Sequence, residues 1–209
     1  MKLTDLKVIY ICPEHNEKYK ARKHHMESLL SSIGFKDIVH YKSSTDSYPR
    51  CLVTATIDIL TTYMDIPFLL LEDDVEFTGE YDFNLDDGVD AIYFGLSRSG
   101  GSSTKNIHDG PSLFEPYSKS QVRVLNMLSA HAILYITPCY KQAVIECLKP
   151  ALTMNYYNDV LISRIQKNFM ILANNSPAFF QSSKFNVPHL EYATKFKLIG
   201  DKAICPDRP

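Results

Sequence analysis

Short apolar runs alternate with helical stripes over the first 71 residues, and this alternation constrains the fold more than any other feature. Three runs are rich in β-branched, aromatic or leucine residues and are typical of buried strands: residues 7–11, 37–41 and 68–71. Two stripes with helical spacing lie between them: Met26, Leu29, Leu30 and Ile33, then Val53, Ile57, Leu60 and Met64. Gly34 and Pro67 supply the stop signals. This β-α-β-α-β order predicts an α/β fold with a largely parallel sheet covered on both faces.

The second half of the sequence is less regular. Three further strands are predicted, at residues 90–96, 132–136 and 169–172. Helices are predicted to begin at Thr137-Pro138, a capping residue followed by a proline in the first turn, and at 158–167. Residues 97–119 are polar, and we expect a functional or mobile loop there. The tail after residue 185 is expected to be irregular.

Composition excludes several classes of protein. The formal net charge is −2, so the broad basic surface of a nucleic-acid-binding protein is absent. No apolar run is long enough for a membrane span, and the start of the chain is too polar for a secretory signal. The five cysteines are odd in number and form no Cys-x-x-Cys pair, which indicates reduced thiols. We therefore expect a cytoplasmic protein, or one of the host cytoplasm if the chain is viral.

Glu72, Asp73 and Asp74 follow the apolar run at 68–71 directly. Ligands of parallel α/β sheets bind at the carboxyl ends of the strands, where these acids lie. Alternation along a strand predicts that Glu72 and Asp74 share one side and that Asp73 faces the other. Three adjacent acids repel one another unless a cation lies among them, and carboxylates suit Mg²⁺ or Mn²⁺. The alternative is a solvated, charged turn; the position at the strand end favours a metal site.

The segment 68–77 resembles the Glu-Asp-Asp form of the Asp-x-Asp motif of glycosyltransferases with the GT-A fold. It is most similar to the lipooligosaccharide and procollagen galactosyltransferase family, in which an apolar run also precedes Glu-Asp-Asp. The strand at 8–11 and Arg22 ahead of the first helix resemble that family's opening. Cys12-Pro13 replaces the family's usual Asn-Leu, and its Ser-His pair is missing from the second helix. The chain also resembles the glycosyltransferase domain of a chlorovirus capsid-glycosylating protein.

The resemblance implies a GT-A fold with a mixed, mostly parallel sheet flanked by helices, in one domain of residues 1–209. Its first half, about 1–95, would bind a nucleotide sugar, and its second half, about 96–209, would bind the acceptor. Asp74 and Glu72 would bind Mn²⁺ or Mg²⁺, and Glu72 and Asp73 would contact the ribose or the donor sugar. The nucleotide base would be cradled by five residues: Cys12, Pro13, Glu14, His15 and Arg22.

The resemblance also points to candidates in the second half. Asp159 would be the base that deprotonates an acceptor hydroxyl, although an acid in the first turn of a helix is also favoured by the helix dipole. His189 would be an additional metal ligand, or an exposed residue of the tail. His131 would touch the acceptor. Tyr156 and Tyr157 would stack on sugar rings or belong to the partly buried core.

Two arginines are candidates from their positions alone. Arg98 lies in a small, polar segment after a strand and could close over a diphosphate as part of a lid, or belong to a plain surface loop. Arg50 lies just before the second helical stripe and could reach a phosphate or only solvent.

The lead hypothesis is a metal-dependent glycosyltransferase. It would move a hexose or deoxyhexose from a nucleotide diphosphate sugar, UDP-linked, to a glycan or protein hydroxyl, with inversion and with Asp159 as base. Two alternatives use the same acids or the same fold. One is a metal-dependent nucleotidyltransferase or phosphohydrolase, and the other is a non-catalytic module that binds nucleotide sugars.

Overall fold

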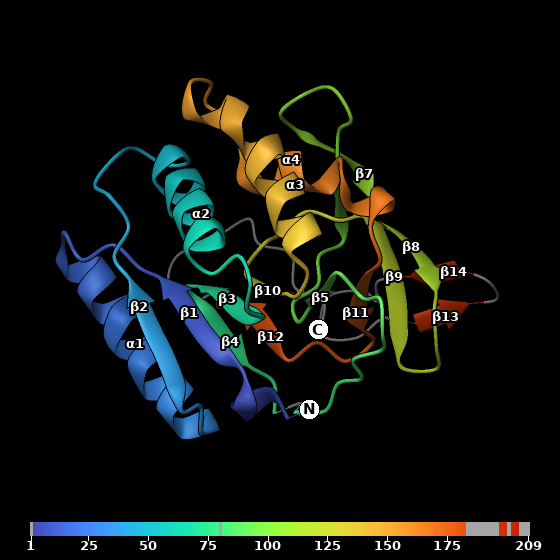
Figure 1. Ribbon diagram of the computed structural model, residues 1–209, viewed down its shortest axis with the longest axis horizontal. Helices are drawn as coiled ribbons and strands as arrows, with labels where there is room; N and C mark the ends of the chain where they lie inside the picture. Colours follow the sequence, from blue (N-terminus) through green and yellow to red (C-terminus); the bar gives the residue numbers. More distant parts are fainter. Residues whose placement is uncertain (1, 80, 183–196, 200–201, 205–209) are drawn as a thin grey trace.

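An eight-stranded sheet forms the centre of the molecule (Figure 1). The computed structural model describes residues 2–79, 81–182, 197–199 and 202–204. In spatial order the strands are β2 (Asp37–Tyr41), β1 (Lys7–Ile11), β3 (Phe68–Glu72), β10 (Ala132–Tyr135), β5 (Ala91–Tyr93), β11 (Ile171–Asn174), β9 (Gln121–Asn126) and β8 (Leu113–Pro116). β10 and β9 run antiparallel to their neighbours, and the other strands share one direction. The sheet is therefore mixed and mostly parallel, as predicted.

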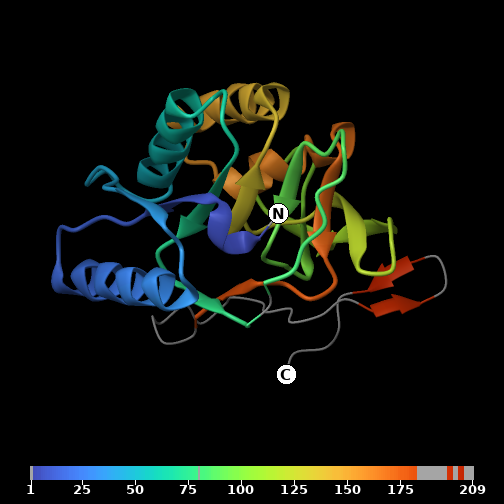
Figure 2. The ribbon, with the colours of Figure 1, turned by 60° about the horizontal axis from the view of Figure 1, so that its bottom comes forward.

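Helices cover both faces of this sheet. Figure 2 shows α1 on one face and α2 and α3 on the other. The α-helices are α1 (Glu17–Ile33), α2 (Arg50–Thr62), α3 (Pro138–Leu148) and α4 (Asn158–Ser163), and the short 3₁₀ helices are η1 (Leu3–Asp5), η2 (Lys149–Leu152) and η3 (Gln166–Asn168). The predicted α/β class, a sheet flanked by helices, is confirmed.

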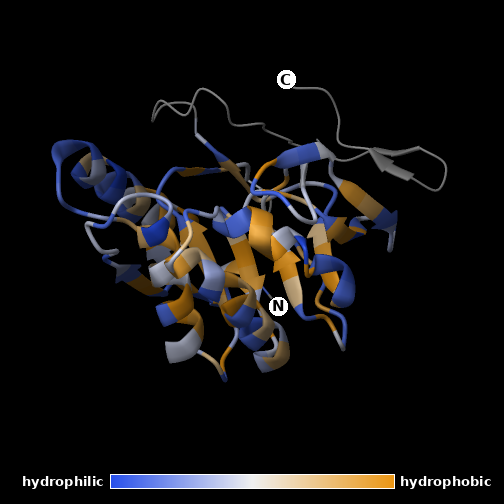
Figure 3. Cartoon of the chain, turned by 90° about the horizontal axis from the view of Figure 1, so that it is seen from above, coloured by the Kyte–Doolittle hydropathy of each residue, from blue (hydrophilic) through white to orange (hydrophobic). Residues whose placement is uncertain are grey.

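Alternation along the strands divides the core into two layers. In β1, Ile9 packs with the residues of α2, α3 and α4, whereas Val8 and Tyr10 pack with α1. Both sets are buried, so the strands are apolar on both sides, as parallel sheets between helices require. In Figure 3 the central strands are accordingly hydrophobic, and hydrophilic residues gather on the outer helices and loops. This division decides which helix each acid of β3 can face.

Local signals set the helix ends as expected. Asn16 caps α1, with its side-chain Oδ1 accepting a hydrogen bond from the Tyr19 amide at 3.1 Å. Gly34 ends the helix with a φ of 95°, in the left-handed region that favours glycine. Thr137 caps α3, and Pro138 occupies the first turn. The helix end predicted at Gly34 and the helix start predicted at Thr137-Pro138 are therefore confirmed.

Several predicted boundaries were wrong. Residues 97–119 are not a long loop but contain β6 (Ser99–Gly101), β7 (His108–Pro111) and β8. The predicted helix at 158–167 is only the short α4 followed by η3, and the strand predicted at 169–172 lies two residues later, as β11. Five further strands were not predicted: β9, β4 (Val75–Phe77), β12 (Phe179–Gln181) and the pair β13 (Lys197–Ile199) with β14 (Lys202–Ile204), the last two in the tail expected to be irregular.

Within the described part of the chain, no helix has the length and apolar character that crossing a membrane requires. The sheet draws its strands from both halves of the sequence, because β10 lies between β3 and β5. This arrangement brings residues from the second half of the chain to the end of β3.

Candidate active site

A pocket of about 330 Å³ lies at the carboxyl end of β3. Glu72, the last residue of β3, lines it together with Asp159 from α4 and Gln181 from β12. Tyr48, Ser97, Ser99, His108, Leu128, Ser129, Ala130 and Asn158 complete the lining. The fold thus brings Glu72 and Asp159, which are far apart in the sequence, to one pocket.

Glu72 points to the α2 and α4 side of the sheet. Phe68 and Leu70 pack in the core layer of those helices, and Glu72 continues the same alternation. Its Oε2 accepts a hydrogen bond from Gln181 Nε2 at 3.1 Å. Burial raises the pKa of Glu72 well above its ordinary value, and the charges of Asp74 and Asp159 raise it further.

Asp73 and Asp74 lie in the turn after β3, and both form ion pairs with the guanidinium group of Arg22. Arg22 of α1 donates to Asp73 Oδ1 at 2.6 Å, and its Nη1 lies 3.6 Å from Asp74 Oδ2. The strict alternation that would place Asp74 beside Glu72 therefore stops at Asp73, because the strand itself ends at Glu72. Arg22 was expected to cradle a nucleotide base, but the structure buries it against these two acids, with 8% of its surface exposed.

The four acids of this region carry more formal negative charge than the positive charge that the structure shows in contact with them. Arg22 offsets one of the charges of Glu72, Asp73, Asp74 and Asp159. Burial raises the pKa of Asp74 to about 6, with Asp73 adding to the rise and Arg22 opposing it. Asp74 Oδ1 and Asp73 Oδ2 are buried and accept no hydrogen bond from the described residues. Unsatisfied carboxylate oxygens and excess negative charge are what a hard divalent cation relieves.

The described residues suit a cation whose coordination shell is completed by a bound ligand, and they do not form a metal site closed by protein groups alone. Among them, no group of three or more His, Cys, Asp or Glu side chains is arranged to hold a metal ion. Mg²⁺ is commonly bound by one or two carboxylates with substrate phosphates and water. His189, the expected third ligand, lies outside the described residues.

Asp159 is held in place by three backbone amides. Its Oδ2 accepts from Ser129 N at 3.2 Å, its Oδ1 accepts from Val160 N at 2.8 Å, and its own N–H donates to Asn158 Oδ1 at 2.8 Å. Burial nevertheless raises the pKa of Asp159 above its ordinary value, because the amide bonds only partly offset the lost hydration. A fixed carboxylate with a raised pKa is suited to accept a proton.

Gln181 and Ser129 are functional candidates that sequence reasoning missed. Besides its bond to Glu72, the Gln181 amide hydrogen-bonds Asp74 and lowers its pKa, so one side chain connects both acids. Ser129 has a φ of 78°, unusual for a residue other than glycine, and this conformation directs its N–H at Asp159. The aromatic pair before Gln181 and the preceding Pro177 were a strand signal that could have revealed β12.

The expected base-binding loop is tied to α1. Glu14 forms ion pairs with Lys23 and with Lys42, the latter at 3.2 Å, and these hydrogen bonds lower the pKa of Glu14 to about 2. Cys12 is buried beside Asp73, where burial raises the pKa of its thiol. Pro13 is half-buried, and exposed His15 packs on Tyr19 with ring centroids 4.8 Å apart.

The remaining candidates divide by their distance from the pocket. Arg98 is half-buried between two residues that line the pocket, Ser97 and Ser99, whereas Arg50 is exposed in the first turn of α2. Tyr156 packs against the core, and Tyr157 is 41% exposed near the mouth of the pocket. The local sequence does not distinguish these two adjacent tyrosines, whereas the turn into α4 gives them different environments.

His131 lies beneath the pocket and not on its surface. It is 3% exposed, its Nδ1 contacts Ser129 Oγ, and it packs so closely on Gly95 that a Cβ at that position would lie 1.8 Å from Nε2. Burial lowers the pKa of His131 to about 4. This placement does not favour the expected direct contact between His131 and an acceptor. It favours a supporting role, in which His131 contacts Ser129 and, through Ser129, helps to position Asp159.

The buried imidazole predicts a specific loss of stability in acid. The unfolded chain takes up a proton at His131 near pH 6.5, whereas the folded chain does so only near pH 4. The free energy of unfolding should therefore fall between those values as the pH is lowered, by up to about 3 kcal/mol. Urea unfolding across this range should show a shallower fall in His131→Gln than in the wild type. His24→Gln, on an exposed face of α1, is the control and should follow the wild type.

A second prediction concerns the buried ion pair. Arg22→Met should lower the free energy of unfolding by about 3–5 kcal/mol, because it leaves Asp73 buried without its partner. Lys20→Met, which breaks an exposed pair with Glu17, should have a much smaller effect. Equal losses in the two variants, measured by denaturant unfolding, would show that Arg22 does not hold the acids.

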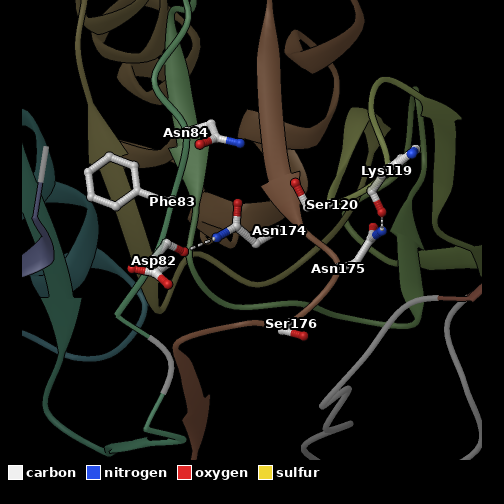
Figure 4. Close-up of a pocket in the computed structure, with 8 residues that line it drawn as sticks. All are labelled: Asp82, Phe83, Asn84, Lys119, Ser120, Asn174, Asn175 and Ser176. Atoms are coloured by element: carbon white, nitrogen blue, oxygen red, sulfur yellow. Dashed lines mark hydrogen bonds between the residues drawn. The ribbon is translucent and has the colours of Figure 1, made fainter.

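A second pocket, of about 280 Å³, is separate from the acids (Figure 4). Its polar groups are largely bonded to one another across three segments. Asn174 Nδ2 donates to the Asp82 carbonyl at 3.0 Å, and Asn175 Nδ2 donates to the Lys119 carbonyl at 3.0 Å (Figure 4). These bonds anchor the segment before β5 and the turn before β9 to the end of β11, which is a structural role.

Comparisons with known proteins give a fold likeness only. No family model matches the sequence, and no curated protein matches it. CTP:phosphocholine cytidylyltransferase from Streptococcus pneumoniae is 8% identical, with 85% of this chain and 93% of that chain covered and a TM-score of 0.41. A glycosyltransferase involved in glycosylation of the major capsid of PBCV-1 is 10% identical, with 73% and 71% covered and a TM-score of 0.42. A nucleoside-diphosphate-sugar pyrophosphorylase from Vibrio cholerae is 13% identical, with 79% and 70% covered and a TM-score of 0.43. At this level of likeness, the function has to be inferred from the pocket itself.

Proposed function

We propose that this protein is a metal-dependent glycosyltransferase of the GT-A type. It would transfer a hexose or deoxyhexose from a UDP-linked sugar to a hydroxyl group of an acceptor. The observation that carries the proposal is the pairing of Glu72 and Asp159 across one pocket, with Asp74 on the turn directly behind Glu72. The mixed sheet that places these acids at the end of β3 supports it.

Asp159 would act as the base. Its carboxylate takes the proton of the acceptor hydroxyl as the acceptor oxygen forms a bond to the anomeric carbon of the donor. The bond from that carbon to the diphosphate oxygen breaks, and UDP leaves with the electron pair. A single displacement of this kind inverts the anomeric configuration, and it requires one base on the acceptor side.

Asp74 and Glu72 would hold the Mn²⁺ or Mg²⁺ ion. The ion supplies charge stabilisation for the departing diphosphate. Asp74 Oδ1 accepts no hydrogen bond in the described structure and is therefore available as a ligand. Gln181 hydrogen-bonds Glu72, and Arg22 forms an ion pair with Asp73.

The composition of the pocket favours glycosyl transfer over phosphoryl transfer. Nucleotidyltransferases and phosphohydrolases stabilise the charge on the attacked phosphoryl group with lysine or arginine clamps as well as metal ions. Among the described residues that line the pocket there is no lysine or arginine; its polar groups are hydroxyls, amides, carboxylates and the imidazole of His108. Such groups are suited to sugar hydroxyls.

Calorimetry of UDP and UDP-hexoses, with and without Mn²⁺, tests the proposal. We expect binding that requires the metal and that weakens at least tenfold when EDTA replaces it. Binding of equal strength without metal, or no binding of either ligand, would count against a metal-dependent transferase. The same titrations with CTP and ATP measure how far the site distinguishes nucleotides.

A further inference from the structure

Tyr48 and Tyr157 form an exposed aromatic pair at the mouth of the pocket. They are 63% and 41% exposed, among the large apolar side chains that the described structure leaves in solvent. Their ring centroids lie 5.8 Å apart, with the planes inclined by 43°. Tyr48 lines the pocket, and Tyr157 directly precedes α4, two positions before Asp159. The pair therefore stands beside the proposed base.

The backbone beside each ring belongs to an ordered helix start. The Tyr157 amide donates to Asn106 Oδ1 at 2.9 Å, and Asn106 Nδ2 donates to the Asn155 carbonyl at 3.1 Å. Tyr48 directly precedes Pro49, a buried residue that caps α2. The two rings contact each other on anchored backbone, and such preorganisation reduces the entropy lost when a ligand binds.

The surroundings of the pair match the chemistry of a sugar ring. A pyranose has apolar C–H faces that pack on aromatic rings, and hydroxyls around its edge that need hydrogen-bonding partners. Here the rings of Tyr48 and Tyr157 adjoin a wall of hydroxyl, amide and carboxylate groups: Ser97, Ser99, Ser129, Asn158 and Asp159. The volume of about 330 Å³ is at the small end of the range for ligand pockets, which suits one sugar residue.

A peptide acceptor is less well matched. Extended peptides are commonly bound through their backbones, along an exposed strand edge or in a long groove. β2 and β8 are the edge strands of the main sheet, and neither lines this pocket. The small sheets contribute one residue from each of three strands, Ser99 of β6, His108 of β7 and Gln181 of β12, and not the length of a strand edge.

We propose that the acceptor is a carbohydrate, and that its terminal sugar ring packs on Tyr48 and Tyr157 while one of its hydroxyls faces Asp159. This inference rests on the proposed function and narrows it, because the sequence alone leaves a glycan or a protein hydroxyl open. It also gives Tyr48, which no sequence motif singled out, a role in recognising the acceptor.

Saturation-transfer NMR with a panel of methyl hexosides tests the inference on the whole protein, in the presence of UDP and Mn²⁺. At least one glycoside should receive saturation from the wild type. The double variant Tyr48→Ala/Tyr157→Ala should bind it at least about tenfold more weakly, and Tyr48→Phe/Tyr157→Phe should retain binding because the rings remain. Tyr81→Ala removes an exposed ring that does not line the pocket and is the matched control.

Two results would overturn the inference: no binding of any methyl hexoside, or binding that persists in the double alanine variant. A serine- or threonine-containing peptide that binds where the glycosides do not would favour a protein acceptor. UDP binding, measured separately by calorimetry, distinguishes the two proposals. If the wild type binds a glycoside through the tyrosines but fails to bind UDP, the aromatic site stands and the glycosyltransferase proposal fails.

Discussion

Asp159→Asn is expected to lower the rate of sugar transfer by roughly 10²- to 10⁴-fold, the usual contribution of a general base. Asparagine preserves the size of the side chain, but it has a single acceptor oxygen and can keep only one of the two bonds from the Ser129 and Val160 amides. It cannot take the acceptor's proton. The loss should appear in kcat, while the Kd for UDP with Mn²⁺ stays near the wild-type value. Transfer assays at saturating donor and acceptor, paired with calorimetry, separate the two quantities.

Asp58→Asn is the matched control for this substitution. Asp58 is an exposed acid of α2 whose Oδ2 accepts a hydrogen bond from the Tyr41 hydroxyl, far from the pocket lining. It should leave kcat unchanged. If Asp159→Asn also left kcat unchanged while Asp74→Asn abolished transfer, Asp159 would be only an acid in the first turn of a helix, and the base would be another group.

Asp74→Asn is expected to reduce transfer by roughly 10³-fold, corresponding to about 4 kcal/mol of lost transition-state stabilisation by the metal. It should also abolish the effect of Mn²⁺ on thermal stability. In the wild type, a cation present at a hundred times its Kd should stabilise the fold by about 2.7 kcal/mol. Thermal unfolding with and without Mn²⁺ measures this difference directly.

The stability of Asp74→Asn without metal separates a functional loss from misfolding. The pKa of Asp74 is raised to about 6, so its charge in the folded protein is unfavourable at pH 7 in the absence of a cation. Removing that charge should leave the metal-free variant as stable as the wild type, or more stable. A large destabilisation without metal would instead indicate that Asp74 serves the fold, and the metal assignment would lose its support.

The first third of the fold was predictable because its signals are local. The apolar run at 7–11 and the helical stripe that ends at Gly34 contain their own start and stop signals, and β1 and α1 follow them. The position of Glu72 at the end of a buried strand was predictable for the same reason. Alternation also placed Glu72 and Asp73 on opposite faces, towards α4 and α1 respectively.

The remainder depends on contacts between distant parts of the chain. The insertion of β10 between β3 and β5 is a matter of long-range pairing, which no local pattern specifies. The segment 97–119 looked like a loop because glycine and serine carry little strand propensity. Gly101 is nevertheless buried against α4, where a Cβ would lie 2.1 Å from Ser163 Oγ, so close packing and not flexibility explains the glycine.

The same limit applies to the site. Gln181 reaches Glu72 only because β12 pairs with β4, and Tyr48 meets Tyr157 only because the segment before α2 lies beside the start of α4. Arg22 shows the same limit. It was predicted to lie ahead of the first helix, but α1 begins at Glu17 and contains it, and the turn after β3 sets the partner of its guanidinium.

Product analysis tests the central claim most directly. The protein would be incubated with a UDP-hexose labelled in the sugar, a methyl hexoside as acceptor and Mn²⁺, and the products would be separated by chromatography. The account predicts that the label moves to the methyl hexoside in step with the release of UDP, and that both products disappear with EDTA. Release of UMP, pyrophosphate or a sugar phosphate without any labelled glycoside would contradict it, and would identify a nucleotidyltransferase or phosphohydrolase that uses the acids of β3 for phosphoryl chemistry.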